Sequence, residues 1–166
     1  MMKVLQLGKF YPIKGGVEKV MEIFTEGLAE RGFPSDMLCV SRNGNTDNVI
    51  LSEHARVLRT QKLAEIAATM ISPQLIWRLR CIRRKYDIIH VHHPDPMAAL
   101  ALFFSGYKGK VVLHWHSDIL KQKFLLRFFK PLQSWLIRRA DLILGEPIRA
   151  LEVIDLDLAF LFFRLD

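Results

Sequence analysis

The sequence predicts an α/β fold in which an open parallel sheet carries helices on both faces. Short apolar runs that suit buried strands alternate along the chain with longer segments whose apolar residues recur at helical spacing. The strand candidates are apolar over almost their whole length, as strands covered on both faces are. At 166 residues, the chain suits one domain with a substantial core.

Each element has its own local signal. Gly8 is expected to close the first strand, and the first helix is predicted from Val17 and ends near Gly32, which can adopt a left-handed conformation. Residues 42–48 are rich in turn formers, and Pro131 leaves open whether the last helical segment is one helix or two. The predicted strands cover 3–8, 35–41, 55–60, 86–93, 110–116 and 140–145, and the later helices cover 73–84, 94–105 and about 120–139.

The charge is unevenly distributed. The formal net charge is +7, and segments 76–85 and 121–139 hold 11 of the 24 basic residues without any acidic residue. Such segments attract anions such as phosphorylated metabolites, nucleic acid or an anionic membrane. No known nucleic-acid-binding module is recognisable, so nucleic acid is not an expected partner.

Other features of the composition point to the cytosol. Cys39 and Cys81 lie far apart and form no metal motif, which suits a reducing compartment. The first residues are too short an apolar run for a signal peptide, and no stretch approaches the roughly 20 apolar residues that span a bilayer. The expected location is therefore cytoplasmic, with a peripheral position on the inner face of the membrane as a variant suggested by the basic segments.

Three loops are expected to meet at one edge of the sheet, because ligands of open parallel sheets bind beyond the carboxyl ends of the strands. These loops are Lys9–Gly16, His92–Asp95 and His114–Asp118. The first contains Gly15 and Gly16 where loop becomes helix, a position at which bare backbone amides and the helix dipole can bind a diphosphate. A plain strand-to-helix turn explains the two glycines equally well, and neither a dinucleotide nor an ATP motif is present.

The histidines allow two interpretations. Strand alternation places His90 and His92 on one face, and His114 and His116 likewise, so a zinc-dependent hydrolase site with Asp95 or Asp118 as a further ligand is one alternative. The other interpretation makes His90 and His114 hydrogen-bonded core residues. We favour the second and expect a functional role for His116, because it should lie at the edge of the sheet.

Three segments, in this order, resemble the N-terminal half of retaining glycosyltransferases of family 4. They are GGVEKVMEIFTEGLAERG (15–32), DIIHVHHPDPMAALAL (87–102) and VVLHWHSDILKQK (111–123), and the resemblance covers residues 3 to about 145. These enzymes consist of two Rossmann-like domains that face each other across a cleft, the B-type glycosyltransferase architecture. The resemblance implies that this chain is a single Rossmann-like half of such an enzyme.

The resemblance also implies roles for individual residues. The loop with Gly15 and Gly16 would approach the donor diphosphate, and His116 would contact the transferred sugar as the catalytic residue. Lys121 would help to hold a phosphate-bearing acceptor, and Tyr11 lies in the acceptor-side loop. Family members work without a metal or other cofactor, using protein cations and amides to stabilise the leaving nucleotide diphosphate. The full set of expected acceptor-side residues is Tyr11, Lys62, His93, Asp118 and Lys121.

The last residues depart from the family pattern. Residues 1–146 are predicted to be the acceptor-side domain, whereas 147–166 form an apolar tail unlike the family, as a truncated or frameshifted product would have. An alternative is a terminal helix that packs on the sheet. In the family, a second domain carries the nucleotide-sugar site and an EX7E motif, and this donor-binding half is expected to be absent from the chain.

The sequence therefore predicts the N-terminal half of a hexosyltransferase that is inactive by itself. The partners implied are a nucleotide-diphosphate sugar, bound through the second domain, and a glycan or polyprenyl-linked acceptor of O-antigen or another surface polysaccharide. Transfer is expected to proceed with retention at the anomeric carbon. The alternatives are the metal-dependent hydrolase and a non-enzymatic module that binds an anionic membrane through Arg78, Arg80, Arg83 and Arg84.

Overall fold

The computed structural model describes residues 1–12, 15–66, 69–116 and 123–145, except for the side chains of 123–128. The tail at 147–166 lies outside these residues. The described elements are β1 (Val4–Tyr11), α1 (Gly16–Glu30), β2 (Ser35–Ser41), β3 (Asp47–Ser52), β4 (Ala55–Thr60), β5 (Ala64–Ile66), β6 (Thr69–Ile71), α2 (Pro73–Ile82), the 3₁₀ turn η1 (Arg83–Lys85), β7 (Ile88–His93), α3 (Pro96–Ser105), β8 (Lys110–Trp115), α4 (Lys123–Arg139) and β9 (Leu142–Gly145).

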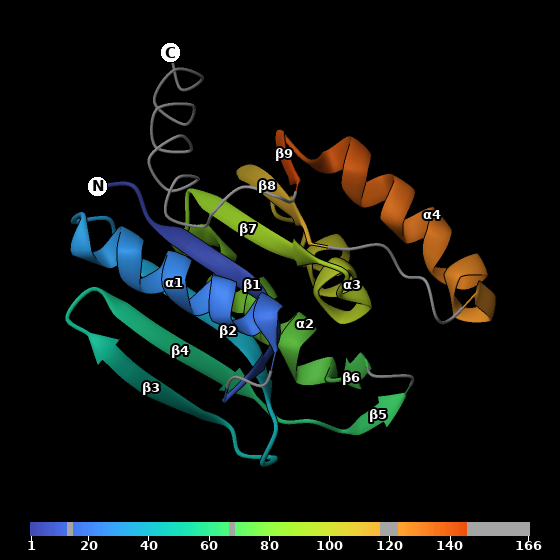
Figure 1. Cartoon of the computed structure of the whole chain (residues 1–166), viewed down its shortest axis with the longest axis horizontal. Coiled ribbons are helices and arrows are strands. Elements are labelled where there is room, and N and C mark those ends of the chain that lie inside the picture. Colours follow the sequence, from blue (N-terminus) through green and yellow to red (C-terminus); the bar gives the residue numbers. More distant parts are fainter. Residues whose placement is uncertain (13–14, 67–68, 117–122, 146–166) are drawn as a thin grey trace.

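The predicted α/β fold is confirmed. Seven strands form one sheet in the order β3-β4-β2-β1-β7-β8-β9, and β5 and β6 form a separate hairpin. Six strands of the large sheet run parallel, while β3 pairs antiparallel with β4 at the edge. The chain thus winds outward from β1 in both directions, first through β2 and β4 and then through β7, β8 and β9 (Figure 1).

Helices cover both faces of the sheet. On one face, Phe24 and Leu28 of α1 pack against Val4, Ile88 and Val112. On the other face, apolar residues of α2, α3 and α4 join the alternate residues of the same strands in the largest cluster of buried side chains. This cluster includes Leu5, Leu7, Leu75, Leu79, Val91, Ala98, Leu113 and Leu136.

The helix ends follow the signals in the sequence. The carboxylate of Asp95 accepts hydrogen bonds from the amides of Met97 (2.9 Å) and Ala98 (3.2 Å), and Pro96 occupies the first helical position of α3. Gly32 follows α1 with a φ of 83°, as predicted for a left-handed helix stop.

Several predicted boundaries were wrong. The first strand does not end at Gly8 but continues to Tyr11. Of the two possibilities left open for the last helical segment, the structure shows one helix, α4, which passes through Pro131. Strand β3 and the hairpin of β5 and β6 were not predicted, because β3 is an edge strand of alternating exposure and the hairpin strands have three residues each. Among the described residues, no helix combines the length and the apolar character needed to cross a membrane.

Candidate functional site

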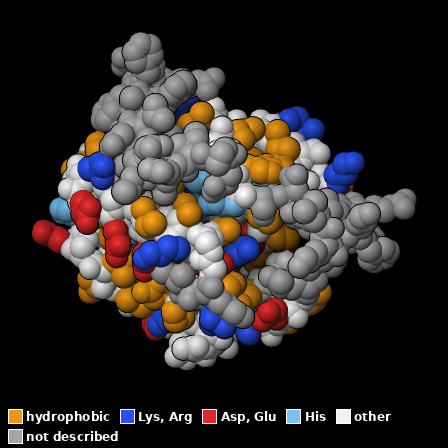
Figure 2. Space-filling view, in the orientation of Figure 1, with side chains coloured by type: hydrophobic (Ala, Val, Ile, Leu, Met, Phe, Trp, Pro, Cys, Tyr) orange, Lys and Arg blue, Asp and Glu red, His pale blue; other side chains and the backbone are white. Residues whose placement is uncertain are grey.

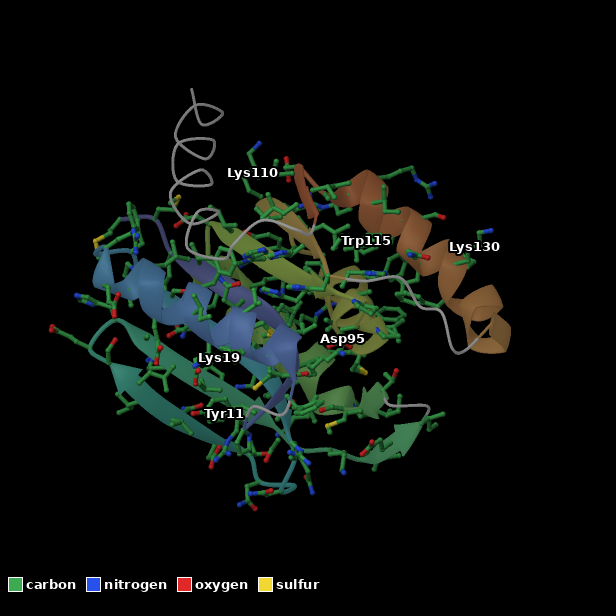
Figure 3. The ribbon with its side chains drawn as sticks, viewed as in Figure 1. Tyr11, Lys19, Asp95, Lys110, Trp115 and Lys130 are labelled. Atoms are coloured by element: carbon green, nitrogen blue, oxygen red, sulfur yellow. The ribbon has the colours of Figure 1, made fainter. Side chains whose placement is uncertain are left out.

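The three predicted loops start from neighbouring strands. Strands β1, β7 and β8 are adjacent and parallel, so their carboxyl ends lie at one edge of the sheet, here called the rim. Gly15 and Gly16 follow β1, and His116 follows β8. Lys9 lies in the last part of β1, and its positive charge contributes to lowering the pKa of His116 and opposes the rise in the pKa of Asp95. Asp95 and Trp115 mark the rim in Figure 3, and Lys110 marks the opposite end of β8.

Four histidines line the α1 side of the sheet. His90 and His92 of β7 alternate with Val91, and His114 and His116 alternate with Trp115, as the strand pattern predicted. Their rings form a continuous row: the centroids of His90 and His92 are 4.5 Å apart, those of His92 and His114 are 5.4 Å apart, and those of His114 and His116 are 4.0 Å apart. The edge of Phe24 from α1 covers the buried end of the row.

A hydrogen-bond chain runs from the core to the rim through His92. Its Nε2 lies 2.8 Å from Oε1 of Gln6, and its Nδ1 lies 2.9 Å from Nε2 of His116. Since a carbonyl oxygen only accepts, His92 donates from Nε2 and accepts at Nδ1. His116 must therefore donate from its own Nε2, so Nδ1 is the unprotonated nitrogen of its ring.

Their surroundings keep the imidazoles of His90, His92 and His116 neutral at pH 7. Burial, and then the neighbouring histidines, lower the pKa of His90 and of His92 well below the usual value. Burial, with smaller contributions from Lys9 and His93, lowers the pKa of His116 to about 4. At neutral pH, His116 is an uncharged hydrogen-bonding group at the rim, suited to contact a sugar hydroxyl.

The nitrogens of His90, His92 and His114 are close enough to suggest a metal centre. One ligand atom from each lies within 4.8 Å of the others. However, both nitrogens of His92 already make hydrogen bonds, to Gln6 and to His116. The rings of His90 and His114 are also nearly parallel, at 5°, whereas ligands of one ion must converge on it. A metal would have to break the chain that orients His116. Asp95, one of the two further ligands that the metal interpretation considered, caps α3.

The two glycines start α1 at the rim. Gly15 is the N-cap, and its amide donates to Oε2 of Glu18 at 2.7 Å. A Cβ atom on Gly16 would meet no heavy atom of the described residues within 4 Å, so the first turn of α1 is open on that side. The helix N-terminus is therefore accessible, and the Glu18 carboxylate already occupies one of its amides.

The remaining predicted residues lie in different places. Tyr11 ends β1 and packs with Met21 and Val57 of the α1 face, and its ring lies 6.0 Å from the guanidinium of Arg59. Lys62 precedes the β5–β6 hairpin, where its Nζ lies 3.4 Å from Glu65.

His93 is buried on the other face of the sheet. Its ring stacks on Trp115 at 3.9 Å, and its Nε2 lies 3.2 Å from Nε2 of Gln133 in α4. The sheet thus separates the side chain of His93 from the row that ends in His116. Asp118 and Lys121 lie outside the described residues.

Sequence reasoning missed three residues of the site. Gln6 anchors the hydrogen-bond chain, the charge of Lys9 acts on both Asp95 and His116, and Glu18 binds the Gly15 amide. A signal for Gln6 was available, since it is a polar residue between Leu5 and Leu7 in an otherwise apolar strand. The partners of Lys9 and Glu18 depend on how α1 crosses the sheet, which the sequence does not reveal.

Two curated proteins resemble most of the chain. The O-antigen chain mannosyltransferase C of Escherichia coli is 34% identical over 146 residues, which are 87% of this chain and 39% of that protein. The D-rhamnosyltransferase WbpZ of Pseudomonas aeruginosa is 28% identical over 146 residues, which are 87% of this chain and 38% of that protein. The chain therefore spans about two fifths of the length of these curated relatives.

A solved structure shares the fold. A sucrose-phosphate synthase from Thermosynechococcus elongatus superposes with a TM-score of 0.60 at 16% identity, over 86% of this chain and 42% of that chain. Residues 14–145, most of the chain, match the model of the family described as Glycosyltransferase Family 4. This match includes the two glycines at its beginning and the whole histidine row. The chain belongs to glycosyltransferase family 4.

Proposed function

We propose that this chain forms the acceptor side of a transferase that moves a sugar from a nucleotide-diphosphate sugar to a glycan or polyprenyl-linked acceptor, with retention at the anomeric carbon. The observation that carries the proposal is the common position of the open α1 N-terminus and the neutral His116, both at the rim. Backbone amides of the first turn can bind phosphate oxygens, while an imidazole beside them contacts the sugar.

His116 is proposed to hold the transferred sugar by accepting a hydrogen bond. In the tautomer that its bond to His92 sets, the ring of His116 accepts hydrogen bonds through Nδ1, the atom proposed to receive a sugar hydroxyl. A charged imidazolium could not accept this bond and would repel the positive charge that develops on the sugar ring during departure of the diphosphate. The lowered pKa of His116 therefore suits this role.

The donor diphosphate is proposed to approach α1 at Gly16. The positive end of the helix dipole favours an anion there, and Gly16 has no side chain to keep it away. The buried carboxylate of Glu18 opposes an anion at the Gly15 amide, so a bound phosphate would contact the Gly16 side of the turn. Lys9 supplies a compensating positive charge near the same edge.

The reaction is proposed to need no metal or other cofactor, because protein amides and cations can stabilise the leaving diphosphate. The two curated relatives are named for transfer of mannose and D-rhamnose, and one of them for the O-antigen chain, which supports a surface polysaccharide as acceptor. The nucleotide is expected to bind mainly through a second domain, so the 166-residue chain by itself should transfer little sugar. A cytoplasmic location remains a prediction.

A chimera tests this proposal. Residues 1–145 of this chain would replace the matching segment of the Escherichia coli mannosyltransferase, and mannose transfer would be measured with the relative's own substrates. We expect a folded chimera that transfers mannose, and an about 100-fold loss of turnover with His116→Ala. The matched control is His54→Ala, at an exposed histidine between β3 and β4, which should leave turnover unchanged.

Two outcomes would contradict the proposal. One is a folded chimera in which His116→Ala and His54→Ala have equal turnover. The other is stoichiometric zinc in the purified 166-residue chain, combined with hydrolase activity that chelators abolish, which would support the metal-dependent alternative instead. Sugar transfer by the isolated chain would show that its expected inactivity is wrong.

A further inference from the structure

A cavity opens at the amino ends of β7, β8 and β9, at the other end of the sheet from the rim. It has a volume of about 670 Å³, within the range of roughly 300–1,000 Å³ that small-molecule sites cover. Its walls include residues of η1, of the turn between α3 and β8, of the start of β8 and of the end of α4. We call it the amino-end cavity.

Cationic side chains dominate the lining of the amino-end cavity. The lining has five of them and two carboxylates, those of Asp87 and Asp141, which leaves a net of three positive charges. The cations come from four separate segments of the chain, so the fold gathers charges that are distant in the sequence. The five cationic residues are Arg83, Arg84, Lys108, Lys110 and Arg139.

The two carboxylates have structural roles that the fold explains. Asp87 precedes β7, and its Oδ2 accepts a hydrogen bond from the amide of Lys3 at 2.7 Å. Asp141 precedes β9, and its Oδ2 accepts from the amide of Val111 at 2.9 Å. Each carboxylate thus joins the start of its own strand to the start of the neighbouring strand.

Two of the five cations are held by one of these carboxylates. Nζ of Lys110 lies 3.3 Å from Oδ1 of Asp141, and the guanidinium of Arg139 donates to Oδ2 of Asp141 at 3.2 Å. Arg139 also donates to the carbonyl oxygens of Gly109 (2.5 Å) and Tyr107 (3.4 Å). These bonds join the end of α4 to the turn between α3 and β8, so this wall of the cavity is fixed in place.

The other three cations have no such role. Arg83, Arg84 and Lys108 make no ion pair within the described part of the chain. The backbone amides of Lys108 and Gly109 likewise donate no hydrogen bond to another described residue. Like charges around one cavity repel each other, so the stability of the fold does not explain why they are gathered there. A bound anion would explain it.

We propose that the amino-end cavity binds a soluble compound that carries two or more phosphate groups. Phosphate oxygens accept charge-assisted hydrogen bonds from Lys and Arg, and the guanidinium fork of arginine suits them well. A single phosphate would fill a small part of the cavity, whereas linked phosphate groups can contact cations on several walls. The aromatic residues of the lining, Tyr86 and Tyr107, are buried, so the recognised chemistry is the phosphate chain and not a nucleotide base.

The amino-end cavity is separate from the proposed transferase site. Lys110, which lines the cavity, starts β8, and Trp115 ends the same strand at the rim (Figure 3). A strand of six residues spans about 20 Å. A ligand in the cavity is therefore too distant to contact the transferred sugar. The inference goes beyond the proposed function and does not depend on it.

Isothermal titration calorimetry of the 166-residue chain with inorganic tripolyphosphate tests the proposal. We expect saturable binding whose affinity decreases as the salt concentration rises from about 0.1 to about 0.5 M. Inorganic phosphate should bind about tenfold more weakly, and so should dimethyl phosphate, which has the single charge of a phospholipid diester. Comparison of the three probes thus separates a soluble polyphosphate from a lipid headgroup.

Two double variants locate the bound probe. Arg84→Gln/Lys108→Gln removes two exposed cations of the cavity and should weaken tripolyphosphate binding about tenfold or more. The matched control, Arg31→Gln/Lys130→Gln, removes the same charge at two exposed residues that do not line the cavity, and it should leave the affinity within about twofold. Tripolyphosphate should also raise the unfolding temperature of the unmodified chain and of the control variant, because it binds the folded state.

Three results would overturn the proposal. The first is the absence of both a heat of binding and a rise in unfolding temperature. The second is an equal effect of the two double variants, which would show attraction to the net charge or binding elsewhere, for example at the N-terminus of α1. The third is equal affinity for tripolyphosphate and dimethyl phosphate, which would assign the cavity to single phosphate groups.

Discussion

The two faces of the sheet bury different kinds of residue and carry helices of opposite charge. Under α1 lie Gln6 and the histidine row, while the side chains under α2, α3 and α4 are almost all apolar. Figure 2, which views the α1 face, shows acidic and basic side chains mixed over it. The helices of the other side contain no acidic residue. One face thus supplies polar groups to the rim, and the other supplies the main core and a layer of helices without acidic residues.

This difference explains how a parallel sheet can hold four imidazoles without losing its stability. Strand alternation places successive residues of β7 and β8 on opposite faces of the sheet. The histidines on one face therefore leave the apolar packing of the other face unchanged, where Val91 and Leu113 remain in the core. The edge contacts of Phe24 replace part of the packing that apolar residues would give.

The largest expected effect concerns the apolar face. Leu75 of α2 is fully buried in the main cluster, so Leu75→Ala should lower the free energy of unfolding by about 3 kcal/mol, through lost burial and a remaining cavity. Urea titration followed by circular dichroism measures this. The matched control, Leu63→Ala at a residue that is 73% exposed, should change the free energy of unfolding by less than about 0.5 kcal/mol. Equal effects would mean that this face is not the main source of stability.

The polar face should make stability depend on pH. The pKa values of His90, His92 and His116 are lowered in the folded chain, so between pH 6.5 and the lower folded values the unfolded chain binds more protons. Stability should therefore be highest above pH 6.5 and fall as the pH decreases, by about 1.4 kcal/mol per pH unit for each such histidine.

The variant His90→Gln isolates one of these contributions. It should reduce the slope of unfolding free energy against pH by about 1.4 kcal/mol per pH unit between pH 6 and 5, because one proton uptake is removed. His54→Gln, at an exposed position, is the control and should leave the slope unchanged. A slope that is the same in both variants would show that His90 is protonated in the folded chain.

Sequence patterns predicted the parallel core of the fold well. The bounds of β2 and β4 were those predicted, because each strand has an apolar centre, Met37–Val40 and Val57–Leu58, flanked by polar residues. Pro131 was ambiguous, since an interior proline removes one backbone hydrogen bond but burial of Phe129 and Leu136 holds α4 together on both sides of it. Propensity alone cannot weigh these two effects.

The site was less predictable, because its contacts depend on register. The row of histidines followed from alternation, but the bond between His92 and His116 requires that β7 and β8 pair with His92 opposite His114. The position of Gln6 opposite His90 depends in the same way on the pairing of β1 with β7. Nothing in a single sequence fixes these offsets, so the tautomer of His116 could be derived only from the structure.

A smaller effect would test the hydrogen-bond chain. Gln6→Leu removes the acceptor that fixes the proton of His92 on Nε2, so His92 and His116 should each populate both tautomers. Long-range ¹⁵N–¹H correlation spectra of labelled protein report the protonated nitrogen. We expect His116 protonated on Nε2 in the unmodified chain and a mixture in the variant. Protonation of His116 on Nδ1 in the unmodified chain would contradict the proposed acceptor role.

The smallest effect should come from Asp95, the N-cap of α3 at the rim. Its carboxylate caps α3, and burial raises its pKa although the amides of Ala98 and Met97 oppose the shift. A raised pKa means that ionisation disfavours the folded chain, so the carboxylate's stabilising role is hydrogen bonding and not charge. Asp95→Ala should therefore lower the unfolding free energy by about 1 kcal/mol at pH 7, and Asp95→Asn by only a few tenths. If Asp95→Asn cost as much as Asp95→Ala, the negative charge itself would matter, and Lys9 would be the cation at the rim that needs it.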